Sequence, residues 1–197
     1  MEGMIPLEEI YGDRFFRKRN SLNWRAKIIC EAVWGELRPA SVIDVGCAIG
    51  DLVAGFLEIG IGAYGLEGSS AAEPYLEVDR DLVYFDDLRE PIEMDPFGLV
   101  TCFEVAEHIE PKHADQFVKN LAGMSDRLLL SIAPPGQGGH YHVNCRPIEY
   151  WIDKFNPLGY APDVEVATRI KDRLAPWKSK PGIKAIYQNL AYFEREI

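Results

Sequence analysis

Cysteine is scarce in this sequence, and the cysteines that occur are not arranged in pairs. Cys30, Cys47, Cys102 and Cys145 lie far apart along the chain, and no CxxC pair is present. Disulfide frameworks of secreted domains rely on regularly spaced cysteines, so these four are expected to be free, reduced thiols. Their pattern therefore favours a cytoplasmic chain.

Long hydrophobic runs are also missing. No segment approaches the unbroken apolar length that a membrane-spanning helix needs, and Met1–Met4 does not open a signal peptide. We therefore expect no membrane partner.

Positive charge is in deficit, with 21 lysines and arginines against 31 acidic residues and a formal net charge of −10. Such a surface on average repels a polyanion, so nucleic acid is not expected as a partner, although Arg14–Arg19 forms a local basic cluster. Hydrophobic residues make up 47% and charged residues 26%, which is typical of a soluble globular protein. A length of 197 residues suits one α/β domain.

The hydrophobic pattern alternates between two kinds of segment. Between residues 22 and 37, apolar side chains recur every three or four positions, which predicts a helix that Pro39 ends. Short runs rich in branched residues follow, and these suit parallel strands buried on both faces, with helices between them. The strand-like runs are 42–43, 63–66, 82–85, 99–103 and 128–132, and the helical stretches are 52–58, 113–124 and 147–155. The pattern weakens over 157–182. A closing strand, which could be antiparallel, is expected within 184–197.

The first strand leads into a glycine-containing turn at Asp44–Gly50, just before a helix. Glycine there permits positive φ and lets a ligand approach the backbone at a helix N-terminus. The second glycine of a GxGxxG fingerprint is missing, because Ala48 stands in the turn and the flanking residues do not fit that register. The sequence therefore does not match the fingerprint of a dinucleotide site that binds a pyrophosphate.

The same segment resembles motif I of class I S-adenosylmethionine-dependent methyltransferases. In that family an acidic residue stands two positions before a G-x-A/G-x-G turn, and Asp44, Gly46, Ala48 and Gly50 fill those positions. The resemblance implies that the loop, with Cys47, wraps the methionine part of the cofactor and that Asp44 helps to orient its ammonium group. The negative charge of Asp44 suits this cofactor, because S-adenosylmethionine carries an ammonium and a sulfonium where NAD carries phosphates.

Acidic residues also follow the next two strands. Glu67, followed by Gly68, ends the second strand, where a carboxylate can accept hydrogen bonds from both ribose hydroxyls. The family resemblance implies that role for Glu67; the alternative is a structural turn with a surface glutamate. Asp87-Leu88 resembles the family's pair beside the adenine, although a solvated turn explains Asp87 nearly as well.

The fourth strand ends in Phe103-Glu104, and Glu107-His108 follow closely. This segment resembles motif IV and its continuation in small-molecule methyltransferases, and the resemblance covers about residues 40–135. It implies that Phe103 lines the cofactor pocket. If Glu104 opens a helical turn, then Glu104, Glu107 and His108 share one face at the carboxyl end of the strand, and His142 follows the fifth strand at the same end.

These four residues are the candidate catalytic groups, and several roles compete for them. They could hold a divalent metal, as in RNA 3′-terminal 2′-O-methyltransferases that share an E-x-x-E-H core. Most relatives with this motif use the residues without a metal, to cap the helix and line the pocket. Alternatively, His108 or His142 serves as a general base, whereas His140 is as well explained as an exposed loop residue.

The resemblance implies a Rossmann-like three-layer αβα sandwich with a mostly parallel seven-stranded sheet whose last strand is antiparallel. We expect one domain over 1–197, with a helical cap at 1–39, a cofactor-binding core at 40–135 and substrate-side loops and closing strands at 136–197. The expected activity is methyl transfer from S-adenosylmethionine to a hydroxyl or amine of a small molecule or sugar, by a monomer or homodimer. Alternatives are metal-assisted methylation of an RNA terminus, a nicotinamide-dependent oxidoreductase, or an inactive cofactor-binding module.

Overall fold

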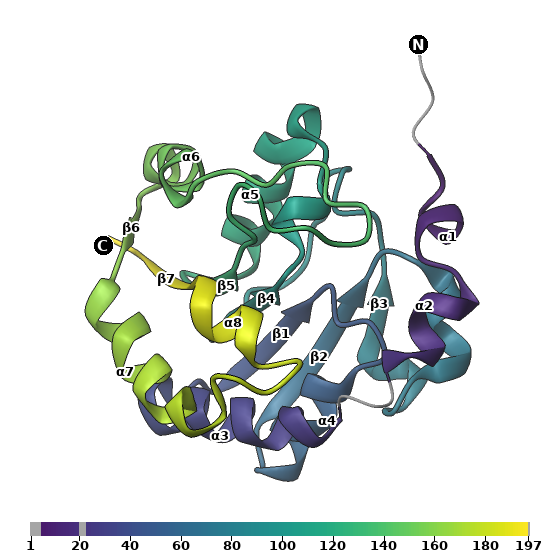
Figure 1. The fold of residues 1–197 in the computed structure, drawn as a ribbon, viewed down its shortest axis with the longest axis horizontal. Coiled ribbons are helices and arrows are strands. Elements are labelled where there is room, and N and C mark those ends of the chain that lie inside the picture. The colour runs from purple at the N-terminus through teal and green to yellow at the C-terminus, as the bar shows by residue number, and fades with distance from the viewer. Residues whose placement is uncertain (1–4, 20–22, 197) are drawn as a thin grey trace.

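A seven-stranded sheet runs through the middle of the protein in the order β3-β2-β1-β4-β5-β7-β6 (Figure 1). The computed structural model describes residues 5–19 and 23–196. Strands β1 to β5 pair in parallel, and β7 runs antiparallel to both β5 and β6. The predicted αβα sandwich with an antiparallel last strand is thereby confirmed. The strands are β1 (Ser41–Val45), β2 (Gly62–Glu67), β3 (Val83–Phe85), β4 (Val100–Phe103), β5 (Arg127–Ser131), β6 (Tyr160–Pro162) and β7 (Leu190–Arg195).

The strands are apolar on both sides because helices cover both faces of the sheet. Val42 packs among the residues of one core and its neighbour Ile43 among those of the other, as alternate side chains of a strand must. Helices α3 (Trp24–Leu37), α4 (Asp51–Glu58), α7 (Val164–Leu174) and α8 (Lys184–Asn189) cover the Val42 side, and α5 (Ala114–Met124) and α6 (Ile148–Phe155) cover the Ile43 side (Figure 1). None of the helices in the described ranges is both long and apolar enough to cross a lipid bilayer.

The C-terminal third differs most from the sequence expectation. Residues 184–189 form helix α8, where the closing strand was expected to start, because Ile183 and Ile186 bury one face at helical spacing. Helix α7 lies in the stretch whose pattern looked weak, and its buried residues recur at Ala167, Ile170 and Leu174. At the other end of the chain, helix α3 begins at Trp24; its expected start at residue 22 lies outside the described residues.

Two short helices, α1 (Leu7–Ile10) and α2 (Asp13–Arg17), lie beside the β2 and β3 side of the sheet (Figure 1). Phe16 of α2 is fully buried, and it packs with Ala48 and Ile49 of the glycine loop and with Ala72. The N-terminal segment is thereby fixed over the loop that follows β1. Single 3-10 turns complete the fold at η2 (Ser70–Tyr75), η3 (Arg80–Leu82), η4 (Ala106–His108), η5 (Pro111–His113), η6 (Asn156–Leu158) and η7 (Ala175–Trp177).

Candidate active site

The turn between β1 and α4 has an unusual backbone. Gly46, Ala48 and Gly50 all have positive φ, at 74°, 52° and 78°. Side chains disfavour this region, and a Cβ at Gly46 would also lie 2.4 Å from Cγ2 of Val105. The loop therefore depends on glycine at position 46 and has a strained backbone at Ala48. Strained backbone of this kind clusters at ligand-binding sites.

Glu67 at the end of β2 is attached to this loop. Its Oε2 accepts a hydrogen bond from the Ala48 amide and its Oε1 one from the Ser69 amide, both at 2.9 Å. The side chain is buried, and desolvation raises the pKa of Glu67 to about 7. Because each carboxylate oxygen has two lone pairs, both oxygens can still accept a hydroxyl proton from a ligand.

Asp44 lies below the loop rather than in it. Its Oδ1 accepts a hydrogen bond from the Thr101 hydroxyl at 2.7 Å, and burial raises the pKa of Asp44 to about 7. The two carboxyls, Asp44 and Glu67, thus make the end of the sheet electronegative once they ionise. This is the polarity that a cationic ligand needs and a phosphate does not.

A pocket lies at the carboxyl ends of β1, β2 and β4, the edge at which open α/β sheets bind ligands. Among the residues predicted to bind the cofactor, those that line the pocket are Gly46, Ala48, Glu67, Gly68, Asp87 and Leu88. Asp44, Cys47, Gly50 and Phe103 lie outside its lining, so their contacts with a cofactor stay predictions.

Cys47 and Asp87 have other partners in the structure. The Cys47 thiol is buried against Gly65 in the core beneath the loop, so only its backbone is near the pocket. Asp87 accepts hydrogen bonds from Arg89 Nε at 2.9 Å and from Nη2 at 2.7 Å. Burial opposes ionisation of Asp87, but these bonds hold its pKa below the ordinary value. Asp87 thus orders Arg89, and Leu88 is the apolar contact that this segment offers.

Glu104 does not belong to a helical turn with Glu107 and His108. Its φ is 55°, and its amide donates to the Ser131 carbonyl at 2.8 Å, so the chain bends sharply where β4 ends. The Glu104 carboxylate lines the pocket and accepts hydrogen bonds from Asn189 Nδ2 at 3.1 Å and Gln137 Nε2 at 2.8 Å. The expected shared face fails for Glu104 because the helical turn, η4, begins two residues later.

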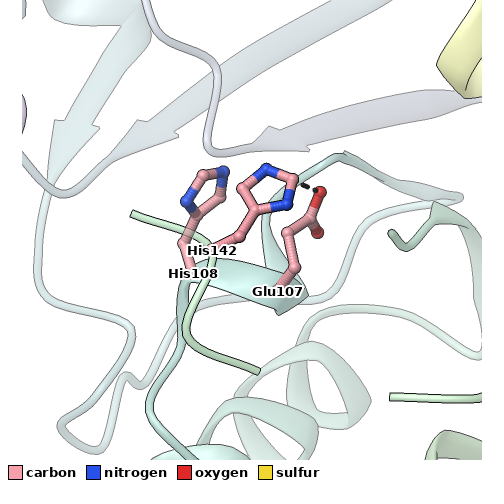
Figure 2. Close-up of side chains that lie close together, drawn as sticks. All are labelled: Glu107, His108 and His142. Carbon is pink, nitrogen blue, oxygen red and sulfur yellow. Dashed lines mark ion pairs between the residues drawn. The ribbon is translucent and has the colours of Figure 1, made fainter. Parts of the chain in front are cut away.

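Glu107, His108 and His142 do come together, as Figure 2 shows. One ligand atom from each lies within 4.8 Å of the others, and His142 Nε2 is 4.0 Å from Glu107 Oε1. Burial, and then the Glu104 charge, raises the pKa of Glu107 to about 8. Burial, and then His142, lowers the pKa of His108 to about 4. His108 lines the pocket, whereas Glu107 and His142 lie behind it.

Solved structures with the same arrangement of strands and helices were found by comparison. A sugar N-methyltransferase from Streptoalloteichus aligns with a TM-score of 0.67 and 16% identity over 100% of this chain and 96% of its own. An O-methyltransferase of a Brevibacillus brevis polyketide synthase, in complex with S-adenosylhomocysteine, gives 0.58 and 17% over 99% and 81%. The magnesium protoporphyrin IX methyltransferase of Synechocystis, with bound S-adenosylhomocysteine, gives 0.54 and 21% over 80% and 84%.

The chain has the fold of S-adenosylmethionine-dependent methyltransferases. No family model matches the sequence, and no curated protein matches it either. At these identities the resemblance is one of architecture, so the residues that act in this methyltransferase fold must be argued from the site itself.

The N-terminal segment, expected as a helical cap, contributes a wall of the pocket. The residues of this segment that line the pocket recur every four positions and are Leu7, Tyr11, Phe15 and Arg19. The Arg19 guanidinium lies 4.8 Å from the Phe15 ring, and burial lowers the pKa of Arg19. The pocket thus has a cation, Arg19, in addition to Arg89, which is paired with Asp87.

His140 closes the same wall from the loop after β5. His140 is exposed, as expected for a loop residue outside the catalytic group. Its Nε2 donates a hydrogen bond to the Ile10 carbonyl at 2.8 Å. Its ring lies 5.9 Å from the ring of Tyr11, which in turn lies 5.7 Å from the ring of His108. His140 therefore links the loop to the N-terminal segment rather than entering the pocket.

Proposed function

We propose that this protein is an S-adenosylmethionine-dependent methyltransferase that transfers the methyl group to a hydroxyl or amine of a small molecule or sugar. The observation that carries the proposal is the position of Glu67, whose buried carboxylate lies in the pocket and is hydrogen-bonded to the Ala48 amide of the strained loop. A ribose fits this carboxylate, and the loop provides room for the methionine part of the cofactor.

The charges of the pocket support this cofactor over a dinucleotide. Glu67 is buried in the lining of the pocket and Asp44 is buried beneath the loop, so the carboxyls on this side of the pocket disfavour a pyrophosphate once they ionise. An ammonium and a sulfonium would instead be attracted. Arg19 supplies the complementary cation for the carboxylate of the methionine part, because it lines the pocket and makes no ion pair within the part of the chain that the structure describes.

Methyl transfer asks mainly for alignment. The sulfonium is already a good electrophile, so holding the acceptor in line with the methyl group and the leaving sulfur supplies much of the rate. Glu104, His108 and Tyr141 line one side of the pocket and can orient an acceptor there. His108 Nδ1 donates to the Tyr141 carbonyl at 3.1 Å, which leaves Nε2 as the atom that can accept a proton.

A small polyhydroxyl acceptor is favoured over a nucleic acid. The sugar N-methyltransferase aligns over the whole chain, and the net charge of −10 disfavours binding of a polyanion.

Mass spectrometry of the purified protein tests the proposal. After incubation with S-adenosylmethionine carrying a deuterated methyl group and a panel of sugars and aminosugars, a product heavier by one deuterated methyl group is expected. The Glu67→Gln variant should form less product at limiting cofactor, and the Glu58→Gln variant, altered at an exposed glutamate of α4, should match the unaltered protein. Failure of every acceptor together with failure to bind S-adenosylhomocysteine would refute the proposal.

A further inference from the structure

The group formed by Glu107, His108 and His142 has two imidazoles and one carboxylate, from two segments that meet only in the folded chain (Figure 2). Glu107 and His108 belong to η4, and His142 comes from the loop after β5. The Glu107 carbonyl accepts hydrogen bonds from the Val143 amide at 3.0 Å and the Asn144 amide at 2.9 Å, which fixes the two segments together. The convergence is therefore held by the backbone.

Both imidazoles are oriented in the same way. His108 Nδ1 lies 3.1 Å from the Tyr141 carbonyl and His142 Nδ1 lies 3.0 Å from the Gln137 carbonyl. A carbonyl only accepts hydrogen bonds, so each Nδ1 carries the proton and each Nε2 carries a lone pair. This is the arrangement in which proteins present histidine to a metal, with the second nitrogen held by a backbone carbonyl.

Among the described residues, Glu107 has no side-chain hydrogen-bond partner that would explain its burial. Its side chain is 0% exposed, and neither carboxylate oxygen has a hydrogen-bond partner within the part of the chain that the structure describes. A buried carboxyl group without hydrogen bonds is costly even when it is protonated, so a protein keeps one only where something compensates it. His142 Nε2, 4.0 Å away, is too far for a hydrogen bond.

We propose that Glu107, His108 and His142 bind a divalent transition-metal ion at the acceptor side of the pocket. Two imidazole nitrogens and one carboxylate favour ions such as Zn²⁺ over Mg²⁺ or Ca²⁺, which prefer oxygen ligands. Ligand atoms about 2.0–2.2 Å from an ion lie roughly 3–3.5 Å apart, so the three side chains, now within 4.8 Å, close by roughly 1–2 Å around it. Glu104 is held by Gln137 and Asn189 instead.

The position of the site suggests its use. Three protein ligands leave at least one coordination position open, and His108 lies in the wall of the pocket, so an open position faces the cavity. A metal there would bind the acceptor oxygen and lower its pKa. This role, which rests on the proposed function, narrows the acceptor to a hydroxyl.

Titration of the metal-free protein with Zn²⁺ by calorimetry, without cofactor, tests the site. One ion per chain is expected, and Glu107→Gln and His142→Gln should each weaken its affinity at least about tenfold. Two control variants should bind as the unaltered protein does: His140→Gln, an exposed histidine of the same loop, and Cys145→Ser, whose thiol lies 3.4 Å from His142 Nδ1, the nitrogen that does not face Glu107.

Thermal unfolding and S-adenosylhomocysteine binding are measured on the same preparations. Zn²⁺ should raise the midpoint temperature of unfolding of the unaltered protein and not that of Glu107→Gln. This variant is expected to fold, because glutamine is close to glutamate in size. Unchanged Zn²⁺ affinity in both ligand variants, or no Zn²⁺ binding by a protein that binds S-adenosylhomocysteine, would overturn the site and leave the proposed function intact. Zn²⁺ binding by a protein that fails to bind S-adenosylhomocysteine would support the site and refute the methyltransferase proposal.

Discussion

The Ala48 amide donates a hydrogen bond to the Glu67 carboxylate across 2.9 Å, and so joins the loop after β1 to the end of β2. Ala48 has a φ of 52°, a conformation that a non-glycine residue adopts at a cost of roughly 1–2 kcal/mol. The hydrogen bond to a charged acceptor offsets part of that cost. One interaction therefore both shapes the loop and directs the carboxylate that we assign to the ribose.

The first prediction concerns Glu67 as a cofactor ligand. Glu67→Gln should weaken S-adenosylhomocysteine binding by about 1–3 kcal/mol, the scale of losing charged hydrogen bonds. Calorimetry measures the affinity, with Glu58→Gln as the control at an exposed position. An unaltered affinity in a folded Glu67→Gln protein would count against the ribose assignment.

The second prediction separates backbone strain from crowding in the loop. Gly46→Ala places a Cβ 2.4 Å from Val105 Cγ2, whereas a Cβ at Gly60, which also has a positive φ, meets nothing within 4 Å. Gly60→Ala should lower the free energy of unfolding by roughly 1–2 kcal/mol through its φ alone. Gly46→Ala should lower it further and abolish cofactor binding.

Chemical denaturation measures both variants, and a Val105→Ala substitution added to Gly46→Ala supplies the control. The double variant, in which the contact is relieved, should lose about as much free energy of unfolding as Gly60→Ala does. Equal losses in Gly46→Ala and Gly60→Ala would mean that the approach of Val105 is not a constraint.

A third prediction follows from the raised pKa of Asp44. The folded protein holds this proton to a pKa of about 7, whereas the ordinary value is 3.8, so the folded state binds more protons than the unfolded state between those values. The free energy of unfolding should therefore fall, through this group, as the pH rises from about 4 to about 7.

Asp44→Asn removes that contribution and keeps an oxygen for the Thr101 hydroxyl. Relative to the unaltered protein, the variant should gain stability as the pH rises through this range, and urea unfolding at pH 5 and pH 7.5 would measure the gap. If the free energy of unfolding of the variant minus that of the unaltered protein does not increase between the two pH values, the pKa of Asp44 is not raised in the folded state.

The fourth prediction concerns Arg19. If its guanidinium pairs with the carboxylate of the methionine part, Arg19→Gln should weaken binding of S-adenosylhomocysteine. Binding of methylthioadenosine, which lacks that carboxylate, should not change. Arg17→Gln, at an exposed arginine paired with Asp13 in α2, should leave both affinities unaltered. Equal losses for the two ligands would instead indicate that Arg19 only shapes the wall of the pocket.

The sequence predicted the parts of this fold whose physics is local. Buried parallel strands are short apolar runs, and the loop at Asp44–Gly50 follows from glycine spacing, so both could be found without coordinates. Helix α8 was missed because Tyr187, Leu190 and Tyr192 form one apolar stretch that is compatible with either a helix or a strand. Only the burial of Ile183 and Ile186 on one face decides between the two.

The site was predictable in composition but not in geometry. Glu104, Glu107, His108 and His142 could all be named, yet the separation of Glu104 from the other three depends on the Ser131 carbonyl, which turns Glu104 to positive φ. The histidine tautomers depend on the carbonyls of Tyr141 and Gln137. Such contacts arise between distant segments, and no local pattern encodes them.

A calorimetric titration of the purified protein with S-adenosylhomocysteine and, separately, with NAD tests most directly which cofactor the pocket binds. S-adenosylhomocysteine should bind at one site per chain. NAD should not bind measurably, because the turn after β1 lacks the second glycine of the GxGxxG fingerprint and the carboxyls of Glu67 and Asp44 disfavour a pyrophosphate. Binding of NAD without binding of S-adenosylhomocysteine would contradict the proposed function.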